Sequence, residues 1–261
     1  MATAADFFPV SARVLYGRNP LNEVICQVRF PTILKIEAEP PSQFQEKIRH
    51  RFPGFEQGAK NPLEGKLPPE ILKIMGPSLG ANSYGFENEN HDVKITLSSK
   101  AMAVATSSYV TWEQFKADVT LALSALADVY EPSFYSRIGL RYQNLLKRST
   151  IGPDANWADL IREELAGELT IPEWAVSVKG VHKTIQCQIN EGDSFTLQHG
   201  LADAEGTEET VYLMDFDYFN ETKVGIADVN VILDRLHGHS GNAFRWAISE
   251  ALHQAMEPQQ G

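Results

Sequence analysis

Apolar and polar residues alternate along several stretches of this chain, a pattern typical of β-strands that bury one face. Residues 22–30, NEVICQVRF, show it clearly, because Val24, Cys26 and Val28 alternate with mostly polar neighbours. Residues 134–146, FYSRIGLRYQNLL, repeat the pattern. Three short strands are predicted within residues 84–110, with turns near 88–91 and 98–100, and three more within 181–220, the first two joined by the turn 190–193.

Two longer stretches, residues 111–130 and 226–256, carry apolar residues at helical spacing. Thr111 is placed to cap the first helix. Its apolar stripe is formed by Phe115, Val119, Ala122 and Leu126. We expect the second helix to be broken around the glycines of residues 238–241.

Three shorter helical segments are also predicted. Residues 42–52 repeat apolar side chains every four residues, with Ser42 as the expected N-cap. Residues 156–165, NWADLIREEL, predict a short helix with Asn156 as its cap. A further helical turn is expected in residues 68–75, PPEILKIM, inside a segment rich in proline and glycine.

Each half of the chain, 1–130 and 131–261, therefore has the order strand, helix, three strands, helix. This order predicts an α+β fold with antiparallel sheets and helices gathered on one face. The closing helices of both halves carry an early phenylalanine, an alanine-rich face and a final Glu-Pro, which indicates a closely packed internal duplication that forms two domains or one. The element order resembles the TATA-binding-protein-like and helix-grip folds.

The net charge of −11 is distributed unevenly. Residues 1–130 hold 13 Lys/Arg and 14 Asp/Glu, whereas residues 131–261 hold 10 and 20. Such an acidic surface disfavours nucleic-acid binding because it repels phosphates. It either keeps the protein in solution or attracts a basic protein partner.

The two cysteines, Cys26 and Cys187, stand in apolar positions of predicted strands and provide neither a disulfide framework nor a metal cluster. We expect buried, unreactive thiols and a cytoplasmic location. No apolar run reaches the roughly 20 residues that a membrane helix needs, and no secretory signal is recognisable at the start. We therefore expect no membrane association.

Several phrases together resemble an uncharacterised prokaryotic family with a sporadic distribution among bacteria and archaea. They are RNPLNEVICQVRFP, YVTWEQF, FYSRIGLRYQN, LMDFDYF and LDRLHGHSGNAFRWAISEAL, which together span nearly the whole chain. The resemblance implies no catalytic residue, because the family has no known function. Its sporadic occurrence implies an accessory role in a defence or toxin–antitoxin locus.

The most promising chemistry lies on one face of the predicted second-half sheet, opposite its apolar side. The candidate binding residues of this polar face are Arg137, Arg141, Gln143, His182, Thr184, Gln186, Asp215 and Asp217. Arginine forks suit bidentate pairing with carboxylate or phosphate. Two interpretations remain open: cross-strand pairing of arginine with aspartate inside the sheet, or a groove for a ligand or partner. The first half has a weaker version of this face, formed by Glu23, Gln27, Arg29, Lys94, Thr96 and Ser98.

Asp215 and Asp217 point to the same side of a strand, where two carboxylates can hold a divalent cation if a third ligand joins them. The alternative is that they are solvated or partner-facing. His237 and His239 diverge on a helix and converge only if the segment is a turn. The Glu64–Lys66 pair stands among prolines rather than on a strand, and the usual phosphate-loop, hydrolase-elbow and zinc motifs are absent from the sequence.

These patterns favour a non-enzymatic interaction or ligand-binding protein that needs no cofactor and acts through the polar face. We expect a protein partner of unidentified kind, or a second copy of the chain. The alternative is a metal-dependent hydrolase or phosphodiesterase with Asp215 and Asp217 as metal ligands, assisted by His182 or His239.

Overall fold

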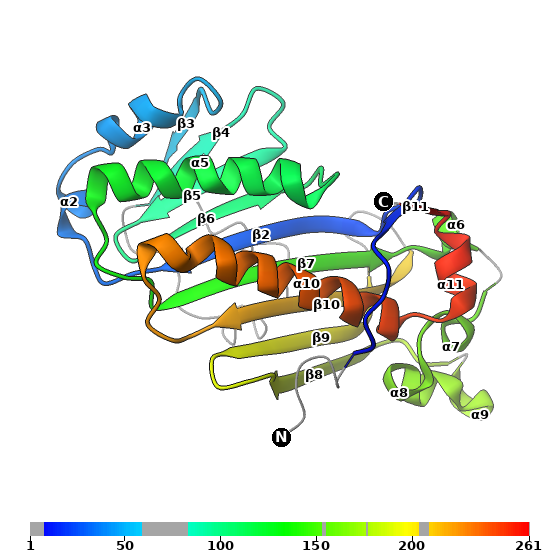
Figure 1. Ribbon diagram of the computed structural model, residues 1–261. Coiled ribbons are helices and arrows are strands. Elements are labelled where there is room, and N and C mark those ends of the chain that lie inside the picture. Colours follow the sequence, from blue (N-terminus) through cyan, green and yellow to red (C-terminus); the bar gives the residue numbers. More distant parts are fainter. Residues whose placement is uncertain (1–7, 59–82, 153–154, 176, 204–208, 261) are drawn as a thin grey trace. The chain divides into compact units, whose positions relative to one another are not determined.

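The computed structural model describes residues 8–58, 83–152, 155–175, 177–203 and 209–260 (Figure 1). The strands are β1 (Val14–Tyr16), β2 (Leu21–Arg29), β3 (Gly54–Gln57), β4 (Ser83–Glu87), β5 (Val93–Ser98), β6 (Ala101–Thr106), β7 (Arg137–Leu146), β8 (Val181–Gln188), β9 (Asp193–Asp203), β10 (Thr210–Asn220) and β11 (Pro258–Gln260). The helices are α2 (Leu34–Ala38), α3 (Ser42–Ile48), α5 (Trp112–Tyr130), α6 (Arg148–Ile151), α7 (Trp157–Leu160), α8 (Glu163–Ala166), η1 (Gly167–Thr170), α9 (Pro172–Ala175), η2 (Ile226–Asp228), α10 (Val229–Ala247) and α11 (Glu250–Ala255). The helical turn predicted at 68–75 and the Glu64–Lys66 pair lie outside the described residues.

The described strands form a nine-stranded sheet, with hydrogen-bonded order β3-β4-β5-β6-β2-β7-β10-β9-β8, and a two-stranded sheet of β1 and β11. The predicted α+β class with antiparallel sheets is confirmed. The predicted turns are also found, since β4 and β5 flank residues 88–92 and β8 and β9 flank residues 189–192. β8 and β3 are the two edge strands.

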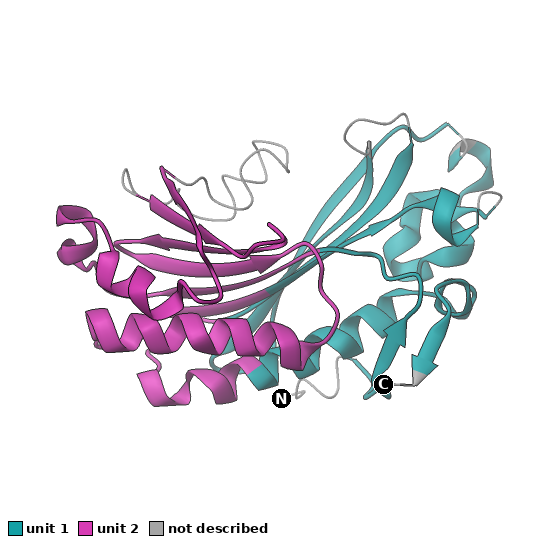
Figure 2. Ribbon diagram, turned by 90° about the horizontal axis from the view of Figure 1, so that it is seen from above, with its two compact units in different colours: residues 1–22, 141–219, 234–261 teal, residues 23–140, 220–233 magenta. Residues whose placement is uncertain are grey.

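The chain divides into two compact units, each built from segments that are distant in sequence (Figure 2). Unit 1 contains residues 1–22, 141–219 and 234–261, and unit 2 contains residues 23–140 and 220–233.

The core of unit 2 lies between α5 and one face of its strands. The register pairs Cys26 with Val104, Val104 with Ile95, and Ile95 with Phe86, so these side chains share one face. All four are buried, and Figure 1 shows α5 lying across these strands. The predicted stripe of α5, with Phe115 at its start, is buried as well.

Of the three predicted N-caps, only one makes a capping hydrogen bond with its side chain. The Thr111 side chain accepts a hydrogen bond from the Gln114 N–H at 3.3 Å, which confirms it as the cap of α5. Ser42 was expected to cap α3, but Pro41 holds that position and the helix has no side-chain cap. Asn156 precedes α7, yet its side chain bonds the Asp159 carboxylate at 3.3 Å instead of a backbone N–H.

Two predicted helices break at other residues than expected. The expected break near Gly238–Gly241 is wrong, because α10 continues to Ala247 and the chain breaks at Ile248. Both glycines are exposed, so they weaken the helix without disturbing its buried side. The helix expected at 156–165 is interrupted instead at Ile161, which is extended, buried and bridged to Ile248.

Candidate interaction surface

The polar face predicted from the sequence exists in unit 1. The Phe195 ring contacts Tyr218 with centroids 5.4 Å apart, so these rings share the apolar face. Neighbouring residues on β9 and β10 therefore point to the opposite side. The register then places Thr184 beside Gln198 and Gln186 beside Thr196 on that opposite side. Unit 1 thus holds seven of the eight candidate residues, and Arg137 belongs to unit 2.

Arg141 and Asp215 form a buried ion pair on neighbouring strands β7 and β10. The Arg141 Nε–H donates to Asp215 Oδ1 at 2.6 Å, and a second N–H of the guanidinium donates to Asp215 Oδ2. Their exposed fractions are only 4% and 2%. Cross-strand pairing therefore holds for these two residues, and each of them satisfies the charge of the other.

The other inner candidates also have partners within their own unit. Gln143 is buried and accepts a hydrogen bond from the Asn22 side-chain amide at 2.8 Å. The guanidinium of Arg137 folds over Gly139, where an added Cβ would collide with it, and lies 3.7 Å from the Glu221 carboxylate. Asp217 is half-buried.

Strand β8 carries the accessible part of the face. His182, Thr184 and Gln186 are all exposed. The opposite side of this strand was predicted to be apolar and inward, but Ile185 is 38% exposed and Cys187 is only half-buried. Both corrections have one cause: β8 is an edge strand, so β9 alone, among the described strands, flanks it. Local alternation does not reveal where a strand stands in the sheet order.

The cysteines differ in their surroundings. Cys26 is 3% exposed, and burial raises its thiol pKa to about 12. Burial also raises the pKa of Cys187, which stands on the more open strand. Both thiols therefore stay protonated and weakly nucleophilic near neutral pH.

His237 and His239 diverge along α10, as a continuous helix requires. The Nδ1 atom of His237 lies 2.8 Å from the Tyr142 hydroxyl. Burial lowers the pKa of His239, so it tends to be neutral. These two imidazoles therefore do not act as joint ligands.

Sequence reasoning missed the polar contacts that hold the β8–β9 turn. The buried Asp193 carboxylate accepts two hydrogen bonds from Arg235 of α10, at 2.6 and 2.9 Å. It accepts another from the Asn190 side chain at 3.0 Å, while Asn190 Oδ1 accepts the Asp193 N–H at 2.8 Å. Asn190 followed by Asp193 was the available signal, since both residue types favour such turns.

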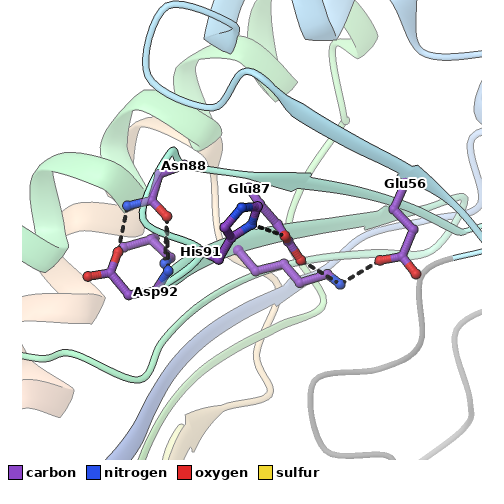
Figure 3. Close-up of polar contacts among 7 residues, drawn as sticks. Glu56, Glu87, Asn88, His91 and Asp92 are labelled. Atoms are coloured by element: carbon purple, nitrogen blue, oxygen red, sulfur yellow. Dashed lines mark hydrogen bonds and ion pairs between the residues drawn. The ribbon is translucent and has the colours of Figure 1, made fainter.

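A second polar cluster surrounds the β4–β5 turn in unit 2 (Figure 3). Lys94 Nζ lies 2.7 Å from the Glu56 carboxylate and 3.1 Å from that of Glu87. The His91 ring is hydrogen-bonded to Glu87 at 2.9 Å. This bond lowers the Glu87 pKa, against an opposing effect of burial, and Lys94 lowers it further. Two carboxylates surround one lysine, so these three groups leave one negative charge in excess beside the edge strand β3.

Within the described ranges, no group of three or more His, Cys, Asp or Glu side chains is placed to hold a metal ion. None of the helices formed by these residues has the length and apolar character needed to cross a bilayer. No family model and no curated protein matches the chain.

Proposed function

We propose that this protein is a non-enzymatic interaction protein that binds a protein partner through the β8 end of its polar face. The observation that carries the proposal is the gradient of exposure across that face. Arg141, Gln143 and Asp215 are buried and bonded to one another or to neighbours, whereas His182, Thr184 and Gln186 are exposed. A partner can therefore contact the β8 residues without first breaking an internal ion pair.

The same geometry supports the metal-hydrolase alternative less well. Both Asp215 carboxylate oxygens accept hydrogen bonds from Arg141, and a cation at that carboxylate would have to compete with a buried guanidinium.

The experiment is affinity purification from the native host, using the wild type and a His182→Ala/Thr184→Ala/Gln186→Ala variant. A matched control carries Glu56→Ala/Gln57→Ala on β3, the other edge strand. We expect a protein, identified by mass spectrometry, to be retained by the wild type and the control and lost from the β8 variant. Binding would then be confirmed with the purified pair. Equal recovery of that protein by all three forms would refute the proposal.

We also propose that the two halves arose by duplication and share the TATA-binding-protein-like or helix-grip topology. The strand order supports this idea. In chain order, β2, β4, β5 and β6 of the first half correspond to β7, β8, β9 and β10 of the second. In the sheet the first set has the order β4-β5-β6-β2 and the second has the same order reversed, β7-β10-β9-β8. The turns support it independently: Asn88 and Asn190 each accept backbone N–H groups and donate to the aspartate that ends the turn. In a crystal structure, superposing residues 21–130 on 137–247 should align Asn88 with Asn190 and α5 with α10.

A further inference from the structure

The outer edge of β8 presents hydrogen-bonding groups of the main chain. The Ile189 N–H donates to the Asp193 carbonyl at 2.8 Å, so Ile189 points its main-chain groups toward β9. In an antiparallel pair this direction alternates with every residue. The N–H and C=O groups of alternate β8 residues therefore point away from β9. These residues are His182, Thr184, Gln186 and Gln188.

Among the described residues, strand β8 itself has few of the features that usually block strand addition. Natural sheets protect their edges with short strands, prolines, bulges or charged side chains. β8 is eight residues long and contains no proline. Its only lysine, Lys183, is turned toward Glu168, with Nζ 2.6 Å from the carboxylate. The opposite edge strand β3 has only four residues, and Glu56 on it forms an ion pair with Lys94.

The edge is also held in a fixed conformation. Arg235, Asn190 and the buried Asp193 tie the β8–β9 turn to α10, and β9 pairs with β8 along its whole length. A preformed strand reduces the entropic cost of adding another strand, because only the incoming segment must be ordered.

The stretch of sequence that contains β8 and β9 is strongly acidic, and this acidity selects the kind of segment that fits. Residues 151–210 contain twelve Asp/Glu and three Lys/Arg, a net charge of −9, out of −11 for the whole chain. Glu163, Glu173 and Glu191 are exposed members of this segment. A basic segment is attracted by this charge, whereas a second copy of the chain would bring the same −9 and be repelled.

From these observations we infer that a basic, extended segment of a partner protein adds to β8 as a further strand of the sheet. This inference rests on the proposed function and specifies how the partner binds. Main-chain hydrogen bonds to the four outward-facing residues supply most of the affinity. The side chains of His182, Thr184 and Gln186 each add little, but together they supply the contacts that the triple alanine variant removes. The acidic segment 151–210 selects for lysine and arginine in the incoming segment.

The test separates main-chain from side-chain recognition. Gln186→Pro removes an outward N–H that β9 does not use, so the fold should tolerate it. Gln186→Val changes the side chain and keeps that N–H. Thr184→Pro and Thr184→Val form a second pair in case Gln186→Pro is damaged, and circular dichroism and urea unfolding check every variant. The probe is a labelled octapeptide of alternating lysine and valine, with its glutamate–valine counterpart as the charge control.

We expect the lysine peptide to bind and to protect the amides of His182, Thr184, Gln186 and Gln188 from hydrogen exchange. The glutamate peptide should bind at least 10-fold more weakly. The proline variants should lower the affinity for the lysine peptide at least 10-fold, and the valine variants less than 3-fold. The partner identified by affinity purification should respond to the same variants in the same way.

Three results would overturn the inference. If valine variants weaken binding as much as proline variants, side chains carry recognition and the strand-addition mode is wrong, while the proposed function stands. If the β8 amides become protected with rising protein concentration and sedimentation shows a dimer, the occupant is a second copy. If the lysine peptide does not protect these amides and the identified partner binds the proline variants normally, the edge is not the docking site. Failure of the proposed function itself is a different result. It would be seen if the triple alanine variant of His182, Thr184 and Gln186 recovered the same proteins as the wild type in the affinity purification.

Discussion

The ion pair between Arg141 and Asp215 is the clearest single-residue feature of the polar face. Both side chains are almost fully buried, and two N–H groups of one guanidinium donate to the two oxygens of one carboxylate. Removing one partner leaves the other charge buried without compensation, which commonly costs about 3–5 kcal/mol. We therefore expect Asp215→Asn to lower the free energy of unfolding in urea by at least about 3 kcal/mol.

The matched control is Asp217→Asn, two residues along the same strand but only half-buried. It should cost less than about 1 kcal/mol, as surface charges usually do. The double variant Arg141→Met/Asp215→Leu should recover most of the lost stability, because no buried charge remains. Equal losses for Asp215→Asn and Asp217→Asn would contradict this assignment.

His199 gives the folded protein a defined response to acid. It is fully buried, and its Nδ1 atom lies 2.8 Å from the Tyr212 hydroxyl. Burial, followed by the nearby charges of Lys183 and His182, lowers its pKa from 6.5 to about 4, against a smaller opposing effect of Glu168. As the pH falls from 6.5 to 4, the unfolded chain takes up this proton before the folded protein does. The contribution of His199 to stability is therefore complete above pH 6.5 and is lost toward pH 4.

The check is the free energy of unfolding at pH 7, 6, 5 and 4 for the wild type and His199→Gln. We expect the variant to lose less stability than the wild type between pH 6.5 and 4, because the proton uptake of His199 no longer differs between the two states. His50→Gln, at an exposed position, should keep the wild-type profile. Parallel profiles for the wild type and His199→Gln would refute the prediction.

At the scale of elements, the two candidate caps allow a direct comparison. Thr111 accepts the Gln114 N–H at the start of α5, whereas Ser42 makes no capping hydrogen bond at α3. We expect Thr111→Ala to lower the free energy of unfolding by about 1 kcal/mol. Ser42→Ala should change it by less than about 0.5 kcal/mol. Urea unfolding distinguishes the two, and a comparable loss at Ser42 would show that helix propensity rather than capping is being measured.

The two glycines of α10, Gly238 and Gly241, lower the intrinsic stability of this helix, which is held in place by the packing of its buried side. An added Cβ at Gly238 or Gly241 meets no atom within 4 Å apart from the helix's own backbone. Gly238→Ala and Gly241→Ala should therefore each raise the free energy of unfolding by about 0.5–1 kcal/mol. Gly200→Ala is the contrasting case, because its φ is +145° and its Cβ would collide with the Val181 carbonyl. It should destabilise the protein, and a thermal unfolding series on the three variants tests both signs.

The strands were predictable from the sequence because period-two alternation is a local signal. β2 and β7 follow runs such as Val24–Val28 closely, and the long helix α5 follows its stripe and cap. Strand order is not local, since it depends on which strands pair across the chain. The exposure of Ile185 at the sheet edge and the break at Ile161 therefore appear only in the structure.

The candidate site shows the same limit. The sequence correctly predicts Arg141 and Asp215 on one face, because parity along each strand fixes the side to which a residue points. It does not predict that they are buried against each other while Thr184 is exposed, since burial depends on position within the sheet. The anchoring of Asp193 by Arg235 joins residues 42 positions apart and leaves no local pattern.

At the scale of the whole molecule, the acidity is concentrated rather than spread. Residues 151–210 carry a net charge of −9, while residues 1–130 carry −1. A net charge far from zero destabilises the compact state of a protein through repulsion among its like charges. Added salt weakens this repulsion, because the Debye length falls from about 30 Å at 0.01 M to about 8 Å at 0.15 M.

We therefore expect the melting temperature to rise when NaCl is increased from about 0.01 to about 0.15 M. Glu173→Gln/Glu191→Gln removes two exposed charges from the acidic segment, so this variant should be more stable at low salt and gain about 1–2 °C less from added salt. Glu46→Gln/Glu89→Gln is the control, since Glu89 occupies the turn position in unit 2 that Glu191 occupies in unit 1. The control lies in the nearly neutral half of the sequence and should keep the salt response of the wild type. If the melting temperatures of both variants rise equally with salt, the charge concentrated in residues 151–210 does not determine the stability of the protein. That charge would then affect only the binding of partners.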